Sequence, residues 1–339
     1  MSLLTALRLN MTNIADPAAD HAERYQAALD MAEYADRCGF TAVSGEEHHL
    51  SATGWLPSPL ILAAAIAGRT RTVRISINAL IIPLYDPVRL AEDIAVLDNL
   101  ALGRFSFVAG MGYRPEEYHA AGKDWSKRGI LMDDCLSVML QAWSDQPFHY
   151  HGRLIDVTPK PHTRPHPMVF VGGMTAAAAR RAARFGLPFS PPMAMPELAA
   201  LYHQELRKHG KPGSQTGFVY HPENGSTVTF LHNDPDEAWA RYGTFIMNEA
   251  AEYSAWKRSG VPRPNETAAS SIEELRHLNN VEILTPEQLV DQTRCGRKEV
   301  VINPLIGGLP IDEGWASLQL LADEVLPRIS PADPDRAER

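Results

Sequence analysis

Cysteine is scarce in this sequence: Cys38, Cys135 and Cys295 are the only three among 339 residues. They are widely separated and odd in number, so they form neither a disulfide framework nor the paired spacing of a zinc site. We therefore expect a protein of a reducing compartment, the cytoplasm.

Long apolar runs and an excess of positive charge are also missing. No apolar stretch reaches the roughly 20 residues that a membrane-spanning helix needs, and residues 1–5 lack the basic and apolar regions of a signal peptide. The formal net charge is -9, which argues against a surface for nucleic acid or for an anionic membrane. We expect partners of neither class, and a small molecule as the substrate.

Short apolar strands alternate with amphipathic helices, a pattern that favours a parallel sheet with crossover helices. The expected strands cover residues 4–11, 40–45, 73–83, 103–110, 168–171, 187–190, 216–231 and 299–303, with an additional hairpin at 149–155. The expected helices cover residues 16–38, 59–67, 88–100, 115–121, 126–143, 175–185, 196–209, 286–294 and 312–329. From 234 to about 283 the pattern is helical, interrupted by a proline-broken stretch at 260–264.

These segments make about eight strand–helix units, the number that a TIM barrel needs. A doubly wound sheet, the rival, normally carries a glycine-rich phosphate turn after its first strand. Here that strand ends in Asn10-Met11-Thr12-Asn13, without a glycine. We predict an α/β fold of the TIM (β/α)8-barrel class, as a single domain over 1–330 with an insertion at about 234–284 and a flexible tail at 331–339.

Chemically reactive residues follow three successive expected strands. Glu46-Glu47-His48-His49 ends the strand at 40–45, Asn78 lies late in the next strand, and Gly110-Met111-Gly112-Tyr113 follows the fourth. Four ionisable side chains do not suit a core, because unpaired buried charge is costly. Since α/β enzymes present their reactive groups at the carboxyl ends of their strands, the three strand ends predict one active site.

Several longer motifs share their residue types, order and spacing with one known group of enzymes. The motifs are Glu47-His48-His49 and residues 82–93, 97–100, 103–105, 110–117, 171–175, 307–309 and 322–327. In these motifs the chain resembles the bacterial luciferase-like, flavin-dependent monooxygenases over nearly its whole length. The stretch from Ile82 to Glu117 is the most specific part of the resemblance.

The resemblance implies a TIM barrel that binds a flavin at the carboxyl ends of its strands. Most members take reduced FMN from a separate reductase and use dioxygen to oxidise a small organic substrate. A second branch binds a deazaflavin, coenzyme F420, and works as a reductase or dehydrogenase. A third possibility is a non-catalytic flavin-binding paralogue that pairs with an active chain. A homodimer or higher homo-oligomer is also implied.

His48 corresponds to the active-site histidine of this family. An imidazole can gain or lose a proton near neutral pH, which suits it to proton transfer. The alternative is that His48 and His49 hold each other and Glu47 in a hydrogen-bond network without a catalytic role. The resemblance also implies that Glu47 binds the cofactor. A metal site is not expected, because consecutive residues at a strand end alternate in direction and no second ligand motif is present.

The resemblance assigns the cofactor to further residues. Asn78-Ala79 aligns with a non-prolyl cis peptide that lies against the flavin ring, although an ordinary strand residue is the alternative. Met111, Gly112 and Tyr113 form a tight turn in which small residues allow close approach. In the luciferases an arginine that grips the FMN phosphate stands at the Met111 position, so this chain departs from the family there.

Two substitutes for that arginine are Arg114 and Arg128. The turn Gly172-Gly173-Met174-Thr175 is a phosphate-site candidate, because free N–H groups at a helix N-terminus favour an anion. A helix cap without a ligand is the alternative. Asp86-Pro87 is expected to be a helix cap. Several large side chains line either the substrate pocket or the core: Trp55, Met193, Met195, Trp239, Tyr242 and Trp256.

Overall fold

The computed structural model describes residues 3–14, 20–210, 217, 219, 228–256, 269–278 and 280–329. Its centre is a nine-stranded sheet with the order β10-β9-β11-β1-β2-β3-β4-β7-β8. The strands are β1 (Leu4–Arg8), β2 (Ala42–Gly45), β3 (Arg74–Ile81), β4 (Phe105–Gly110), β7 (Met168–Gly172), β8 (Phe189–Ser190), β9 (Val228–Leu231), β10 (Val281–Leu284) and β11 (Glu299–Ile302). All neighbouring pairs are parallel. The prediction of a parallel α/β sheet is confirmed.

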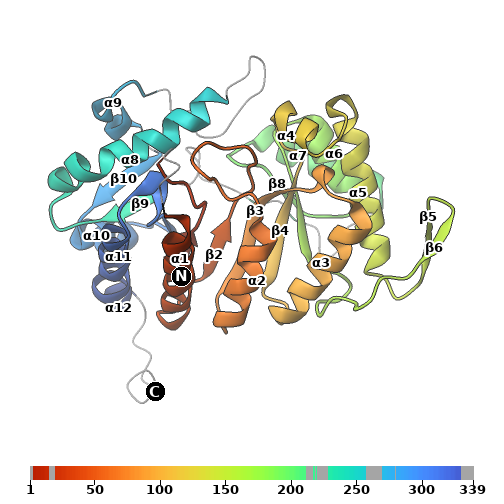
Figure 1. Cartoon of the computed structure of the whole chain (residues 1–339), viewed down its shortest axis with the longest axis horizontal. Coiled ribbons are helices and arrows are strands. Elements are labelled where there is room, and N and C mark those ends of the chain that lie inside the picture. Colours follow the sequence, from red (N-terminus) through yellow and green to blue (C-terminus); the bar gives the residue numbers. More distant parts are fainter. Residues whose placement is uncertain are drawn as a thin grey trace.

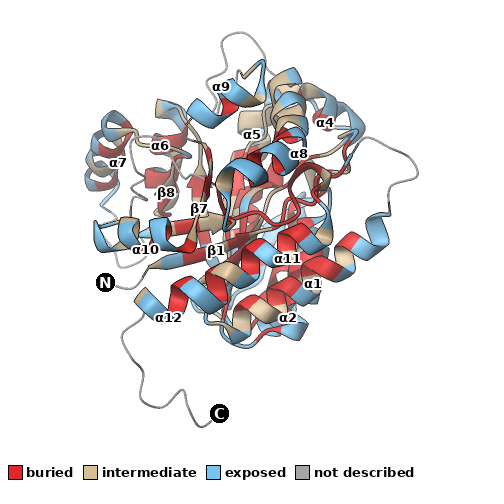
Figure 2. Cartoon of the chain, turned by 90° about the vertical axis from the view of Figure 1, so that its left-hand side faces the viewer, coloured by how far each residue is buried: buried red, intermediate tan, exposed pale blue. Residues whose placement is uncertain are grey.

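Helices connect these strands and cover the sheet (Figure 1). They are α1 (His21–Arg37), α2 (Pro59–Arg69), α3 (Pro87–Leu100), α4 (Pro115–Ala120), α5 (Arg128–Ala142), α6 (Ala176–Phe185), α7 (Pro196–Lys208), α8 (Pro235–Ala255), α9 (Ile272–His277), α10 (Pro286–Arg294), α11 (Ile311–Gln319) and α12 (Leu326–Ile329). In Figure 2, the helices α1, α2, α11 and α12 turn a buried stripe toward the strands and an exposed stripe outward. This amphipathic pattern buries the apolar faces of the helices against the sheet.

Local sequence signals fix several helix boundaries. Asp86 caps α3, as predicted, because its carboxylate accepts hydrogen bonds from the N–H groups of Val88 and Arg89. Thr175 caps α6 through the N–H of Ala178. That helix ends at Gly186, whose φ of 72° lies in the left-handed region that glycine adopts readily.

The predicted hairpin is confirmed as β5 (Phe148–Tyr150) and β6 (Arg153–Ile155), an antiparallel pair. The helical prediction to about residue 283 is wrong at its end, where β10 pairs in parallel with β9. The proline-broken stretch at 260–264, the expected helix start at Asp16 and the tail at 331–339 lie outside the described residues.

The sheet continues past β8, because Phe189 exchanges backbone hydrogen bonds with Gly217 and Val219. The main apolar core lies between the sheet and α1, α2, α3, α5, α6 and α11. A second cluster joins β9 and β10 to α8, and it contains Trp239 and Tyr242. These two side chains, which were candidates for pocket or core, are therefore core residues.

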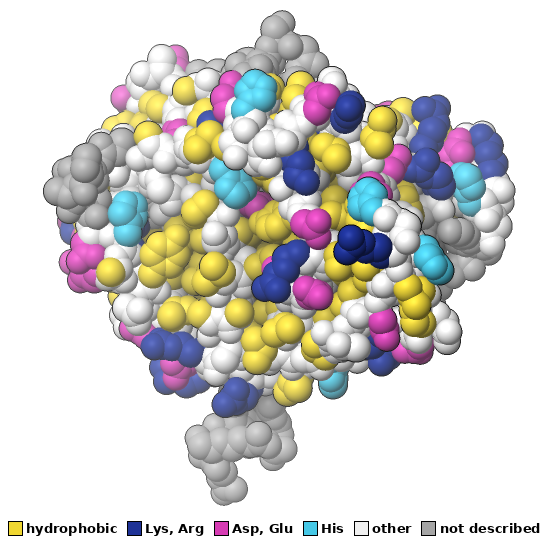
Figure 3. Space-filling view, turned by 45° about the vertical axis from the view of Figure 1, so that its right-hand side comes forward, with side chains coloured by type: hydrophobic (Ala, Val, Ile, Leu, Met, Phe, Trp, Pro, Cys, Tyr) yellow, Lys and Arg dark blue, Asp and Glu magenta, His cyan; other side chains and the backbone are white. Residues whose placement is uncertain are grey.

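The surface carries no broad basic patch on the face that Figure 3 shows, where acidic, basic and apolar side chains are interspersed over the described residues. Among those residues, no helix is both long enough and apolar enough to cross a bilayer.

Candidate active site

The end of β2 presents the predicted cluster of acids and imidazoles. Register places Gly45, the last residue of β2, beside Ile77 of β3, and Ser44 beside Arg8 of β1. Immediately after β2, Glu46 accepts two hydrogen bonds from the guanidinium of Arg8. This pair joins the ends of β1 and β2 and neutralises one of the four ionisable groups.

Glu47 is buried and bonds to the end of β3. Its carboxylate accepts hydrogen bonds from the N–H of Ile81 and the hydroxyl of Tyr85. The ring Nε2 of His49 lies 3.0 Å from the same carboxylate. This hydrogen bond, more than any other influence, raises the pKa of His49. Burial raises the pKa of Tyr85, and the negative charge of Glu47 adds to that effect. All three described partners are protein groups, and the predicted role of Glu47 in cofactor binding stays a prediction.

His48 is only 8% exposed and lies among aromatic rings. Its ring centroid is 5.0 Å from that of Trp55, 4.9 Å from Trp256, 5.5 Å from Tyr113 and 6.4 Å from Tyr253. Such rings exclude water from the imidazole and limit its motion. We name these four side chains the aromatic cage.

Both ring nitrogens of His48 face a polar partner. Nε2 lies 3.4 Å from the hydroxyl of Tyr113, and Nδ1 lies 3.5 Å from Oε1 of the fully buried Glu117. Glu117 also accepts the N–H of His49 at 3.0 Å, and it lies 3.4 Å from Nη1 of Arg114. The end of β2 carries His48, whereas α4 and the turn after β4 supply the polar partners of its ring.

The peptide bond between Asn78 and Ala79 is cis, as the family resemblance predicted. The β3–β4 register shifts between Asn78 and Leu80, which marks a bulge at this point. A Cβ at Gly110 would lie 2.7 Å from the Cβ of Ala79, so the two strand ends approach closely only because residue 110 is glycine.

The turn after β4 packs onto the end of β3. Gly112 has a φ of +69°, and a Cβ there would lie 2.9 Å from the Cγ2 of Ile81. Tyr118 donates its hydroxyl proton to the carbonyl of Met111, which holds the turn onto α4. Together with the Glu47–Ile81 hydrogen bond, this packing brings the three predicted strand ends into one site.

The turn Gly172-Gly173-Met174-Thr175 follows β7, which lies beside β4. A Cβ at Gly172 would lie 2.7 Å from Cγ1 of Val108 on β4, so the β7 turn also approaches that strand closely. Thr175 uses its hydroxyl as the cap of α6. The N-terminus of α6 therefore lies next to the strand-end site, and phosphate binding by this turn stays a prediction.

The two candidate arginines differ in their surroundings. Arg114 donates to the carbonyl of His49 at 2.6 Å, and its guanidinium lies 4.1 Å above the ring of Trp256. It therefore belongs to the surroundings of His48. Arg128 begins α5, stacks 4.2 Å above Trp125 and donates one hydrogen bond to the carbonyl of that residue.

The residues that sequence reasoning missed come mostly from α8. Glu249 accepts hydrogen bonds from Asn10 and Thr12 just after β1, and burial raises its pKa. Glu252 accepts hydrogen bonds from Ser51, Ala52 and Thr53, in the loop that follows β2. Tyr253 joins the aromatic cage beside Trp256, which the sequence had already given as a candidate for pocket or core. The spacing of 249, 252, 253 and 256 places them on one helix face, and this spacing was the available signal.

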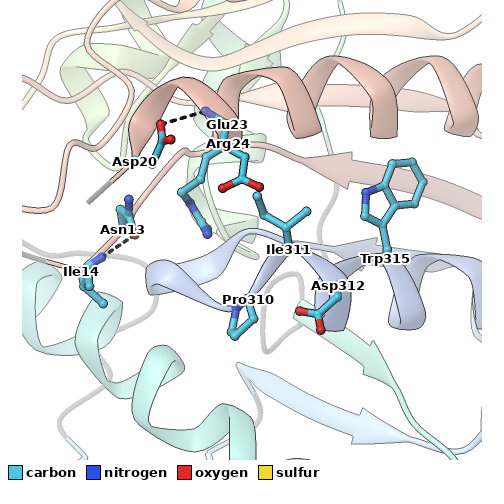
Figure 4. A pocket seen from close by; sticks show the side chains of 9 residues that line it. All are labelled: Asn13, Ile14, Asp20, Glu23, Arg24, Pro310, Ile311, Asp312 and Trp315. Carbon is cyan, nitrogen blue, oxygen red and sulfur yellow. Dashed lines mark hydrogen bonds between the residues drawn. The ribbon is translucent and has the colours of Figure 1, made fainter. Parts of the chain in front are cut away.

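A separate cleft of about 550 Å³ opens between α1 and α11 (Figure 4). Asp20, Glu23 and Asp312 contribute carboxylates to it, whereas Arg24 directs two nitrogens to the backbone carbonyls of residues 305 and 309. The cleft shares no lining residue with the surroundings of His48. We take the strand ends as the candidate active site, because the imidazole and its partners converge there.

Comparison with known proteins identifies the family of the chain. A family model described as luciferase-like monooxygenase matches residues 9–301. The alkanal monooxygenase alpha chain of the Kryptophanaron alfredi symbiont is 28% identical over 177 residues, which are 51% of this chain and 50% of that one. The chain matches about half the length of the curated relatives to which it is similar.

Solved structures share the fold at lower identity. Monooxygenase RslO1 from Streptomyces bottropensis has a TM-score of 0.72 at 23% identity, covering 96% of this chain and 100% of that one. The FMN complex of the oxygenating constituent of 3,6-diketocamphane monooxygenase from Pseudomonas putida has a TM-score of 0.68 at 18% identity, covering 98% and 100%. An F420-dependent secondary alcohol dehydrogenase has a TM-score of 0.67 at 18% identity, covering 98% and 100%. The predicted barrel class is confirmed, and the chain belongs to the luciferase-like monooxygenase family.

Proposed function

We propose that this protein is a flavin-dependent monooxygenase that uses reduced FMN and dioxygen to oxidise a small organic substrate. The observation that carries the proposal is the convergence of His48 with strand ends that have little or no side chain, at Ala79, Gly110 and Gly172. A Cβ at Gly110 or Gly172 would lie 2.7 Å from a side-chain carbon of the neighbouring strand, so the backbones of these strand ends lie close together. A flat tricyclic ring suits such a surface, because main-chain groups can meet the polar atoms at its edge.

The ends of β3, β4 and β7 would hold the isoalloxazine ring through Asn78, Ala79, Met111, Gly112 and Tyr113. The residues 172–175 at the start of α6 would hold the phosphate, since N–H groups and the dipole of a helix N-terminus favour an anion. Arg128 would add the positive charge that Met111 does not supply. Reduced FMN, delivered by a separate reductase, would supply the electrons for the reaction with dioxygen.

The chain's own chemistry is proton transfer in a site that excludes water. His48 can exchange a proton at Nε2, which faces Tyr113. The aromatic cage surrounds the imidazole and excludes bulk water from it, which strengthens the electrostatic interactions of His48.

The test is an anaerobic titration of the protein with reduced FMN, followed by oxygen consumption with candidate aldehyde, ketone and sulfide substrates. We expect micromolar or tighter binding, and a loss of substrate oxidation in His48→Ala. His149→Ala, an exposed histidine of the hairpin, is the matched control and should keep full activity. Normal turnover of His48→Ala would refute the assignment of that residue.

A second candidate function is a coenzyme F420-dependent reductase or dehydrogenase. Met111 favours it, because this position lacks the phosphate-binding arginine of the luciferases, and a dehydrogenase that uses F420 shares the fold. Titration of both cofactors side by side decides between the two functions. Tighter binding of F420 than of reduced FMN would overturn the monooxygenase proposal.

We also propose a homo-oligomer. Ile61 on α2 is 73% exposed, and Val96 and Leu100 on the adjacent α3 are 45% and 53% exposed. Large apolar side chains exposed on adjacent helices are candidates for subunit contacts. Light scattering of the purified protein should give a mass above that of one chain, and a monomer at all concentrations would refute this proposal.

A further inference from the structure

Tyr113, His48 and Glu117 form a line of three polar side chains, with His48 in the middle. The hydroxyl oxygen of Tyr113 is 3.4 Å from Nε2, and Oε1 of Glu117 is 3.5 Å from Nδ1 on the other side of the ring. Since the two ring nitrogens point in different directions, His48 can accept a hydrogen bond on one side while donating on the other.

The members of this line differ in their access to a bound ligand. His48 is 8% exposed, and the aromatic cage surrounds it. Glu117 is 1% exposed. Tyr113 is less buried than either, and it belongs to the turn in which the cofactor is expected. A ligand at the strand ends therefore has easier access to the phenol than to the imidazole.

Two buried atoms of these side chains make no hydrogen bond to any described residue. Among the described residues, Nδ1 of His48 and Oε2 of Glu117 are buried without a hydrogen-bond partner. A buried polar group without a partner costs about 1–3 kcal/mol, and such groups are uncommon in folded proteins. Because Nδ1 and Oε1 need to approach by only a few tenths of an ångström, a bound ligand that presses on Tyr113 can complete the hydrogen bond.

We propose that Tyr113 is the group that touches the bound substrate and transfers the proton, and that His48 acts behind it. The inference rests on the proposed function and assigns the proton-transfer role within the same site. In the proton-loaded form of the site, His48 is an imidazolium whose Nε2–H points to the phenol oxygen of Tyr113. Tyr113 gives its hydroxyl proton to an oxygen of the substrate, and the phenolate takes the proton from Nε2. One proton passes from His48 to the substrate, no electron moves, and the neutral imidazole keeps its Nδ1–H toward Glu117.

Glu117 is the positioning residue of this relay. Its carboxylate favours the hydrogen on Nδ1, so the neutral imidazole that remains after proton transfer has its lone pair on Nε2, where it accepts from Tyr113. The charged and titratable groups that face His48 from all packed elements are Tyr113, Glu117 and Arg114 near α4, and Tyr253 on α8. Arg114 is already bonded to the carbonyl of His49 and lies near Glu117, so Glu117 is the carboxylate that orients the ring.

The first experiment needs no cofactor. Nitrogen NMR of protein labelled at its 13 histidines reports which ring nitrogen carries the hydrogen, and His48→Gln identifies the signals of His48. For the neutral imidazole we expect the Nδ1–H form in the wild type, a changed Nε2 shift in Tyr113→Phe, and a mixture of both forms in Glu117→Gln. Signals that neither variant changes would overturn the relay. If Glu117→Gln does not fold, Tyr113→Phe alone carries the test.

The second experiment follows proton uptake during reoxidation of protein-bound reduced FMN by dioxygen, which is the substrate that takes the proton here, between pH 6 and 9. With reduced FMN at saturating concentration, we expect Tyr113→Phe to slow proton uptake by about 100-fold or more, within the range of general acid–base catalysis. Tyr150→Phe removes the hydroxyl that bonds Asp134 beside the hairpin, and this matched control should behave as the wild type.

The outcomes separate the relay from the proposed function. If Tyr113→Phe keeps the wild-type rate while His48→Gln is slow, His48 touches the ligand directly. The relay then fails, and the proposed function stands. If the wild type does not bind reduced FMN, the proposed function fails, and the NMR measurement still decides whether Tyr113, His48 and Glu117 are coupled.

Discussion

Replacement of Glu47 tests whether this carboxylate supports the site or binds the cofactor. In Glu47→Ala, the buried N–H of Ile81 and the hydroxyl of Tyr85 both lose their acceptor. A buried donor without a partner costs about 1–3 kcal/mol, and a hydrogen bond to a charged group contributes about 1.5–3 kcal/mol. The hydrogen bond between Glu47 and His49 adds little to this free energy, because the ring of His49 is partly exposed. We expect Glu47→Ala to lower the free energy of unfolding by about 3–4 kcal/mol.

Glu47→Gln is the matched variant, because it keeps the shape of the side chain. Its amide oxygen can still accept the N–H of Ile81, and its NH2 group can face Tyr85 and His49, whose polar atoms can also accept. We expect a loss of about 1–2 kcal/mol. Urea unfolding followed by tryptophan fluorescence measures both variants. A loss below about 1 kcal/mol for Glu47→Ala would refute the reasoning.

The same two variants should differ from the wild type in how their stability depends on pH. The folded-state pKa of His49 is raised above its ordinary value, first by the hydrogen bond to Glu47. The resulting stabilisation is complete below the unfolded pKa of about 6.5 and is lost as the pH rises through the folded value. Both variants should therefore lose this pH dependence. If Glu47→Gln instead weakens binding of reduced FMN more than about ten-fold (1.4 kcal/mol) at unchanged stability, Glu47 contacts the cofactor.

Three further changes test the strand ends and their supports. Gly110→Ala should destabilise the protein and weaken binding of reduced FMN, because its Cβ would lie 2.7 Å from that of Ala79; thermal unfolding and flavin titration measure both effects. Asp86→Ala should cost about 1 kcal/mol through loss of the α3 cap, without changing flavin affinity. Burial raises the pKa of Glu249, so the wild type should lose stability as the pH rises through that pKa. Glu249→Gln should remove this loss, and unfolding at pH 5 and pH 8 compares the two proteins.

The sequence was most informative where function depends on strand ends. Parallel strands bring their carboxyl ends to one edge, so His48, Ala79 and Gly110 could be placed together from strand order alone. The cis bond at Asn78-Ala79 was predictable only through the family resemblance, since nothing in the local sequence requires it. The turn after β4 was predictable from its glycines.

The strand β10 was missed for a physical reason. Val281-Glu282-Ile283-Leu284 is only four residues long and follows a segment with helical periodicity. A short apolar run does not distinguish a strand from the end of a helix. Its strand character comes from pairing with β9, about 50 residues earlier in the chain. Contacts of this range depend on packing, and local sequence does not encode them.

The surroundings of His48 depend on α8 (Pro235–Ala255), which contains none of the family motifs. Glu249 ties this helix to the residues after β1, and Glu252 ties it to the loop at 51–53. Tyr253 and Trp256 lie on the same helix face and complete the aromatic cage. The carboxylates of Glu249 and Glu252 hold the helix in the position where Tyr253 and Trp256 contact the imidazole. A change of sequence in α8 therefore alters the environment of His48 without altering the strand ends. Family members can therefore share the strand-end chemistry and still differ in the substrates that reach it.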